Sequence, residues 1–319
     1  MLLDPVQLRA SALSSLKRSQ KPERTILLHT VVILLVSLLL TGVDYMLDQQ
    51  IGITGGLSGM GARSILATIQ SLLRLTQAVV LPFWQIGYTF YSLQVARGQL
   101  SGISDLIEGF RRFGPVLRLK ALTAGLALIL IFVSAYASSF LFMMTPWATP
   151  ILQQMESLTA TMTSEQELLE SFAVLLQDSI VPIMIIFCLC FLAGGAFLFF
   201  RFRLAELWLL DHPEDGALKS LRASKELMRG NWNAMLRIDL SFWWFYLLEV
   251  LVTALGYGDI ILDYFGIEMT TDAFGTYLLF FSIYVWAQMA LYWWKRNEVA
   301  VTYAHAYLFL LPEEPTEEQ

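Results

Sequence analysis

The sequence predicts an all-α protein, a polytopic membrane bundle of six transmembrane helices with amphipathic helices lying on the membrane surface. Two features of composition lead to this prediction. Of the 319 residues, 56% are hydrophobic and only 15% are charged, whereas soluble domains carry about 25% charged residues. Apolar runs long enough to cross a bilayer also recur along the whole chain. They leave no hydrophilic stretch large enough for a separate soluble domain.

Each predicted span has at least the roughly 20 apolar residues that a bilayer core requires. Pro182 is expected in the first turns of the fourth helix, and Gly194 is expected to permit close packing against a neighbour. Residues 1–25 form a cytoplasmic N-terminal interfacial segment, residues 26–311 the membrane domain, and residues 312–319 a disordered acidic tail. The apolar stretch before this tail is expected to extend the last helix. The six spans are expected at about residues 26–47, 64–96, 121–144, 180–210, 238–257 and 274–294.

Several segments are predicted to form amphipathic helices on the membrane surface, among them residues 2–17 and 97–120. Residues 2–17 place Leu2, Val6, Leu13 and Leu16 near one helical face, although a frayed terminus fits the same residues. Residues 97–120 predict a second surface helix that ends at Gly114 and Pro115. Its apolar face would consist of Ile103, Leu106, Ile107, Phe110 and Phe113.

The distribution of charge predicts the orientation. Lys and Arg gather in the N-terminal segment and in residues 97–120, 201–237 and 295–296, and only Arg63 and Arg74 lie elsewhere. The intervening segments contain acids and no bases: residues 48–62, 145–178 and 258–273. Because Lys and Arg favour cytoplasmic loops, this alternation predicts a multi-pass protein of the cell membrane with both termini in the cytoplasm.

Ionisable residues inside predicted spans form a candidate polar site. Glu249 lies near the middle of the fifth span, Arg74 in the outer half of the second and Asp44 near the outer end of the first. An unpartnered charge at the centre of a span costs about 2.5–3.5 kcal/mol on insertion scales. Two interpretations stay open: Glu249 and Arg74 line a cavity for an ion or an anionic solute, or Glu249 is structural, in an ion pair or protonated.

A second candidate surface is basic. Lys219, Arg222, Lys225 and Arg229 lie in the connection between the fourth and fifth spans. Basic residues near a membrane surface attract anionic lipid headgroups by about 1 kcal/mol each. The four residues predict a surface for anionic lipid or for a membrane-protein partner, although setting the topology alone would also explain them.

Residue types for catalysis and metal binding are sparse. His29, His212 and His305 are scattered without metal-ligand spacing, and Cys188 and Cys190 point in different directions on one helix. The sequence shows no paired acids or positioned nucleophile. We therefore expect no enzymatic activity, no cofactor and no metal, and the dispersed basic residues give no indication of nucleic-acid binding.

One stretch resembles a known family. The pattern LLDHPEDGALKSLRASKELMRGNWNAMLRIDLSFWWF is similar to the central signature of the DUF975 family of bacterial integral membrane proteins. The matching residues are Asp211, Pro213, Ser224, Met228 and Gly230. The resemblance implies a six-span bacterial membrane protein and assigns no catalytic residue. The chain departs from the family at residues 292–307, where the proline of the last span is missing.

The predicted function is therefore a non-enzymatic membrane component that binds lipid or a partner protein. The alternative is a small-solute transporter or channel with a polar cavity near Glu249 and Arg74.

Overall fold

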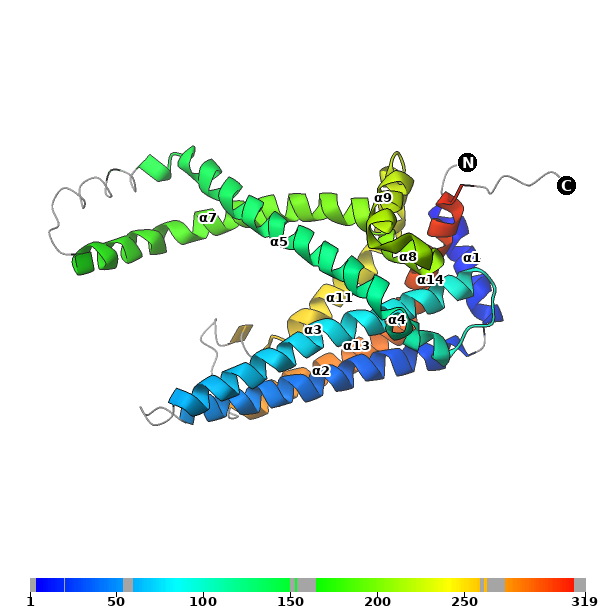
Figure 1. Cartoon of the computed structure of the whole chain (residues 1–319), viewed down its shortest axis with the longest axis horizontal. Coiled ribbons are helices and arrows are strands. Elements are labelled where there is room, and N and C mark those ends of the chain that lie inside the picture. Colours follow the sequence, from blue (N-terminus) through cyan, green and yellow to red (C-terminus); the bar gives the residue numbers. More distant parts are fainter. Residues whose placement is uncertain are drawn as a thin grey trace. The chain divides into compact units, whose positions relative to one another are not determined.

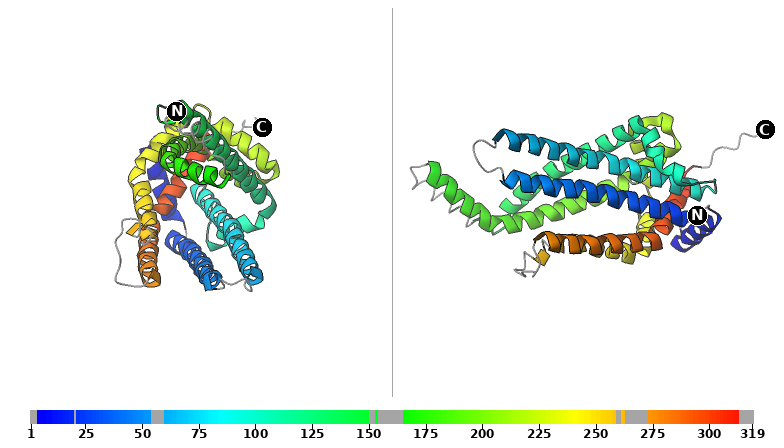
Figure 2. Two further views of the ribbon diagram at one scale, coloured as in Figure 1. Left: turned by 90° about the vertical axis from the view of Figure 1, so that its left-hand side faces the viewer. Right: turned by 90° about the horizontal axis from the view of Figure 1, so that it is seen from below.

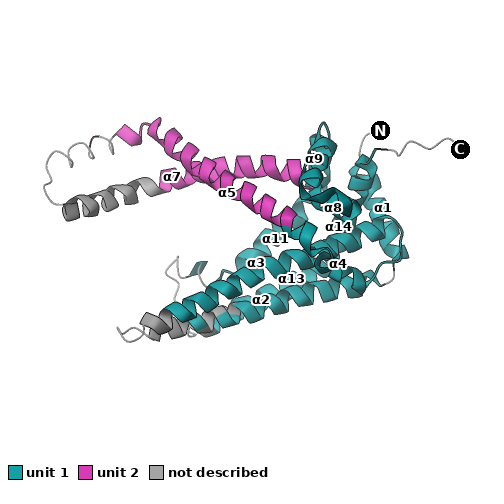
Figure 3. Ribbon diagram, viewed as in Figure 1, with its two compact units in different colours: residues 1–117, 204–319 teal, residues 118–203 magenta. Residues whose placement is uncertain are grey.

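The computed structural model describes residues 4–19, 21–53, 60–149, 153, 165–258, 261–262 and 273–312. Every regular element in these ranges is helical. The chain divides into two compact units (Figure 3). Unit 1 comprises residues 1–117 and 204–319, and unit 2 comprises residues 118–203. The all-α class predicted from the sequence is confirmed for the described part of the chain.

Unit 1 contains two pairs of neighbouring long helices. Helix α2 (Pro22–Ile53) packs along α3 (Met60–Ala96), and α11 (Trp243–Leu255) packs along α13 (Ala273–Leu291) (Figures 1 and 2). Helix α13 continues through one π-helical turn, Tyr292–Arg296, into α14. Apolar side chains cover most of these helices, as expected for elements that face lipid.

Shorter helices gather at one end of unit 1, and we call this group the end layer (Figure 1). Its centre is α14, whose Val301, Ala304, Ala306 and Tyr307 are fully buried. The helical extension predicted beyond the sixth span is therefore present, and it forms the core of this layer. The end layer consists of α1 (Pro5–Arg18), η2 (Ile103–Ile107), α4 (Glu108–Arg111), α8 (Ala205–Asp211), α9 (Gly216–Met228) and α14 (Asn297–Leu310).

Helix α1 packs against α14. Asp4 caps its first turn by accepting a hydrogen bond from the Val6 N–H at 3.0 Å. The buried residues are Leu8 and Ala12, whereas Val6 and Leu13 from the predicted apolar face are exposed. The helix is thus confirmed. Its contact with α14 uses the side that carries the small Ala12, and its position on a membrane surface stays a prediction.

The segment after α3 docks by backbone contact. A Cβ atom built on Gly87 would lie 1.9 Å from the Leu106 carbonyl oxygen, and one on Gly109 would lie 2.1 Å from the Phe83 carbonyl oxygen. Only glycine allows two backbones to approach so closely. Leu106 is fully buried beneath this contact.

This docking corrects the surface helix predicted over residues 97–120. The segment forms the short turns η2 and α4, and α5 then begins at Phe113 and runs through Gly114 and Pro115. Of the predicted apolar face only Leu106 is buried, and the other four residues are exposed. The prediction was wrong because the glycine contacts with α3, rather than an apolar helical face, hold the segment.

Unit 2 contains most of α5 (Phe113–Met143) and α7 (Glu165–Phe202). A Cβ on Gly194 would lie 2.3 Å from Leu130 Cδ1, so the helices approach closely at the predicted glycine. Pro182 lies well inside α7 rather than in its first turns, because the helix already begins at Glu165. Long apolar helices tolerate an internal proline when neighbouring groups satisfy the freed carbonyl.

The described residues contain four helices that are long and apolar enough to cross a membrane: Pro22–Leu40, Ser64–Ala96, Phe113–Met143 and Val181–Asp211. A fifth candidate is a bent pair, α10 (Trp232–Ser241) with α11, which meet at 63°. The predicted fifth span at 238–257 is therefore broken at Phe242. These helices indicate a membrane protein, and six spans remain a prediction.

The close contact at Gly109 predicts that alanine destabilises the protein there but not at Gly114. Gly109→Ala should lower the free energy of unfolding by about 1–3 kcal/mol, because the new methyl group overlaps the Phe83 carbonyl. Gly114→Ala is the matched control: no atom lies within 4 Å of its Cβ position, so the change should be neutral or stabilising by less than about 1 kcal/mol. Denaturant unfolding in detergent micelles measures both. Equal effects would contradict the docking.

Candidate functional site

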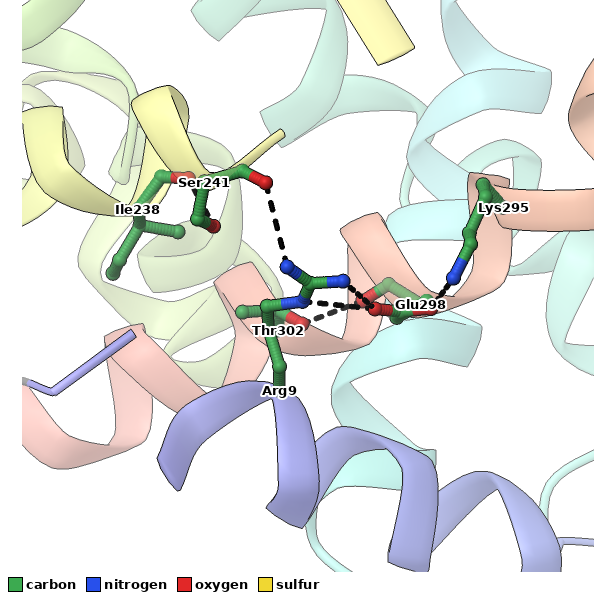
Figure 4. A network of polar contacts seen from close by, with 6 residues as sticks. All are labelled: Arg9, Ile238, Ser241, Lys295, Glu298 and Thr302. Atoms are coloured by element: carbon green, nitrogen blue, oxygen red, sulfur yellow. Dashed lines mark hydrogen bonds and ion pairs between the residues drawn. The ribbon is translucent and has the colours of Figure 1, made fainter. Parts of the chain in front are cut away.

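The Glu298 carboxylate lies between two cations in the end layer (Figure 4). Arg9 Nε donates to Glu298 Oε1 at 3.0 Å, and Lys295 Nζ lies 2.6 Å from Oε2. The Glu298 side chain is only 5% exposed. The two cations compensate a charge that would otherwise be costly to bury. The ion pairs join α1 to α14 and the π-turn.

Arg9 also reaches the break between α10 and α11. Its Nη1 donates to the Ser241 carbonyl oxygen at 3.4 Å, and its guanidinium lies 4.7 Å from the centre of the Phe242 ring. Phe242 is fully buried at the bend. A cation is favourable beside the last carbonyl groups of a helix. Arg9 therefore stabilises the bend as well as the Glu298 carboxylate.

A second carboxylate, Asp211, connects α3, α8 and α14. Arg97 forms an ion pair with Asp211 Oδ1, and the Tyr307 hydroxyl donates to Oδ2 at 2.9 Å. Burial, reinforced by the Asp211 charge, raises the pKa of the Tyr307 phenol. The phenol therefore stays protonated and remains a donor. Arg112 adds a bond to the Leu210 carbonyl oxygen beside this site.

A third polar group surrounds Glu249 on α11. The Tyr292 hydroxyl donates to Glu249 Oε1 at 2.9 Å, and Arg296 Nη1 lies 3.8 Å from the same oxygen. Both partners come from the π-turn, where the wider helical winding changes the directions of the side chains. π-turns of this kind are frequent at functional sites. These contacts attach α11 to the π-turn, and both interpretations of Glu249 from the sequence stay predictions.

The start of α2 is fixed by polar and aromatic contacts. Asn297 donates to the Pro22 carbonyl oxygen at 3.1 Å and accepts from the Tyr88 hydroxyl at 2.7 Å. The His29 ring stacks on Tyr88 with 4.3 Å between ring centroids, and Trp84 donates to the His29 carbonyl oxygen. These bonds attach α2 and α3 to the first residue of α14.

The predicted basic surface lies on α9. Lys219, Arg222, Lys225 and Arg229 are exposed along one side, while Ala217, Ser220, Leu221, Ala223, Ser224 and Met228 are buried on the other. Lys219 Nζ lies 2.6 Å from Asp215 Oδ1. The bond from Lys219, with another from the Trp208 indole N–H, lowers the pKa of Asp215. Among the described residues, the structure records no ion pair for the other three.

The residues of the family-like signature have structural roles. Ser224 Oγ accepts from the Leu204 N–H at 3.2 Å, and Met228 is fully buried. Pro213 begins the 3₁₀ turn that leads into α9, and Gly230 follows α9 with a φ of 83° that favours glycine. With Asp211, these residues shape and attach the α8–α9 hairpin.

The sequence-predicted polar residues have different positions. Glu249 has Tyr292 and Arg296 as its recorded side-chain partners, and Arg74 is exposed on α3. Asp44 lies in α2, and its side chain is outside the described part. Sequence reasoning missed the role of Arg296, which it treated as an interface marker, and it did not single out Glu298. The signal was two bases and an acid within four residues, directly after the apolar α13.

Within the described ranges, no group of three His, Cys, Asp or Glu residues could hold a metal ion. Comparison of the chain with protein-family models, curated proteins and solved structures found no match.

The Glu298 ion pairs predict a stability difference between two acids. Glu298→Gln should lower the free energy of unfolding by about 1–3 kcal/mol, because Arg9 and Lys295 lose their charged acceptor. Glu226→Gln on the exposed side of α9 should change it by less than about 1 kcal/mol. Denaturant titration in micelles compares them. An unchanged midpoint for Glu298→Gln would contradict the role of the ion pairs.

Proposed function

We propose that the chain is a non-enzymatic, multi-pass protein of the cell membrane that binds anionic lipid headgroups through α9. The observation that carries the proposal is the exposed line of Lys219, Arg222, Lys225 and Arg229 opposite the buried face of the same helix. Many other basic residues of unit 1, such as Arg9 and Arg97, are occupied by internal ion pairs. On α9, by contrast, Arg222, Lys225 and Arg229 are exposed and have no recorded ion pair among the described residues, so a ligand can reach them.

The chemistry of α9 favours an anionic surface. Each basic residue close to an anionic membrane contributes about 1 kcal/mol. The exposed Glu226 and the Asp215–Lys219 pair reduce the positive charge without cancelling it. Leu218, exposed beside Lys219, supplies an apolar contact of the kind that interfacial helices insert among headgroups. Phosphate-bearing lipids therefore fit α9 better than a cationic or apolar ligand.

The proposed orientation places the end layer in the cytoplasm. The helices nearest both termini, α1 and α14, lie in this layer together with α9 (Figure 1), and the bases at positions 295–296 directly precede α14. Lys and Arg accumulate on the cytoplasmic side of membrane proteins. The similarity of the central signature to the DUF975 family supports the same proposal of a six-span bacterial membrane protein.

Retention of anionic lipid tests the α9 proposal. A variant with Lys219, Arg222, Lys225 and Arg229 all changed to Gln should retain phosphatidylglycerol at least about tenfold less than the unchanged protein, as four contacts of about 1 kcal/mol allow. Native mass spectrometry of the full chain, purified from vesicles containing this lipid, measures the retention. The matched control changes Lys17, Arg18, Lys21 and Arg24, which are also exposed.

The control should retain most of the lipid, because its charges lie outside α9. Equal losses in both variants would show a general charge effect and overturn the α9 proposal. If the α9 variant loses a co-purifying protein while its lipid retention is unchanged, the ligand of α9 is a partner protein and the lipid proposal is overturned.

Cysteine labelling tests the orientation. A cysteine at position 160, which lies outside the described residues, is expected on the outer side, because residues 145–178 contain acids and no bases. In a background with Cys188 and Cys190 changed to Ala, Ala160→Cys should react with a membrane-impermeant maleimide on intact cells. Labelling only after permeabilisation would reverse the proposed topology.

A further inference from the structure

The Glu249–Arg296 pair is an incomplete salt bridge. Arg296 Nη1 lies 3.8 Å from Glu249 Oε1, which is beyond the range of a charged hydrogen bond. Oε1 already accepts from Tyr292. Within the described part of the chain, no hydrogen bond to Oε2 is recorded.

The Arg296 guanidinium has five N–H groups and should have several acceptors. Among the described residues, the structure records no hydrogen bond from it, and its Nε is buried without a partner. Such unsatisfied groups in a folded protein require an explanation. The unsatisfied N–H donors of Arg296 therefore lie beside Glu249 Oε2, an acceptor without a recorded hydrogen bond.

This pair can be reached from outside. The Glu249 side chain is 27% exposed and that of Arg296 is 30% exposed. Trp243, Trp293 and Trp294, on the same two helical segments, are also exposed. Exposed tryptophans are typical of the membrane–water interface, where lipid headgroups lie. The two helical segments that hold the pair therefore carry the residue type typical of the headgroup region.

The charges restrict the ligand class. A simple anion would be attracted by Arg296 but repelled by Glu249, and a simple cation would meet the opposite problem. A zwitterion satisfies both groups. The centre of the Tyr292 ring lies 5.2 Å from the Arg296 guanidinium carbon, so an aromatic ring borders the pair. Aromatic faces also stabilise ammonium groups.

We propose that Glu249 and Arg296 bind a zwitterionic group that carries a primary ammonium and a phosphate or carboxylate. The anionic oxygens accept from Arg296, and the ammonium donates to Glu249 Oε2. This site is separate from α9, so the two proposals can fail independently. A phosphoethanolamine lipid and a free water-soluble zwitterion share this chemistry.

Competition between lipids tests the site on the full chain. In vesicles with equal parts of phosphatidylethanolamine, phosphatidylcholine and phosphatidylglycerol, the purified protein should retain phosphatidylethanolamine preferentially. Phosphatidylcholine lacks the ammonium N–H donors. Glu249→Gln, which is nearly isosteric, should reduce phosphatidylethanolamine retention about tenfold, as expected for the loss of a charged hydrogen bond. It should also raise phosphatidylglycerol retention, because the repulsive carboxylate is gone.

Arg296→Gln should abolish the retention of both lipids at this site. Arg111→Gln is the control, since Arg111 is 69% exposed and pairs only at 3.5 Å with Glu108. Circular dichroism verifies that each variant is folded, and Glu249→Gln keeps the test valid if Arg296→Gln unfolds. If free phosphoethanolamine displaces the lipid, the headgroup alone is the ligand, whereas failure to displace it shows that the acyl chains contribute.

Either displacement result supports the zwitterion site. An unchanged ratio of the three lipids in folded Glu249→Gln, together with no binding of free phosphoethanolamine, would overturn it. Water would then fill the gap between Glu249 and Arg296.

Discussion

The Glu298 carboxylate, held between Arg9 and Lys295, is the interaction on which the arrangement of the end layer depends. A nearly buried carboxylate is stable only with compensating charge. Its two cations come from opposite ends of the chain, so compensation requires α1 to lie against α14. The same Arg9 then stabilises the bend at Phe242. One compensated charge thus connects both terminal helices and the broken helix.

Around this ion pair, unit 1 combines two kinds of packing. Its long helices expose apolar side chains, whereas the end layer is held by carboxylates with several donors and by backbone contact at Gly87 and Gly109. Asp211 repeats the principle of Glu298, with Arg97 and Tyr307 as donors. Hydrogen bonds and ion pairs between distant segments are directional, so they fix the relative orientation of those segments, which apolar packing alone does not.

Charged residues that are paired inside the fold have structural roles, whereas charged residues without a full set of partners carry the proposed functions. Arg9 and Arg97 are engaged inside the fold, so their roles are structural. The exposed bases of α9 and the partly exposed Glu249–Arg296 pair keep polar groups available to a ligand. Both places suit headgroups, one by net positive charge and the other by paired opposite charges.

The sequence by itself determined the helical class, the long apolar helices, the segregation of charge and the basic side of α9, because these follow from local composition and periodicity. It also predicted α1 as a helix, but not which of its faces would be buried. Only the tertiary structure decided that Arg9 meets Glu298, 289 positions away, and that residues 97–112 dock through glycine instead of forming a surface helix. Helical periodicity shows which residues share a face, whereas the partner of that face depends on contacts between segments far apart in the chain.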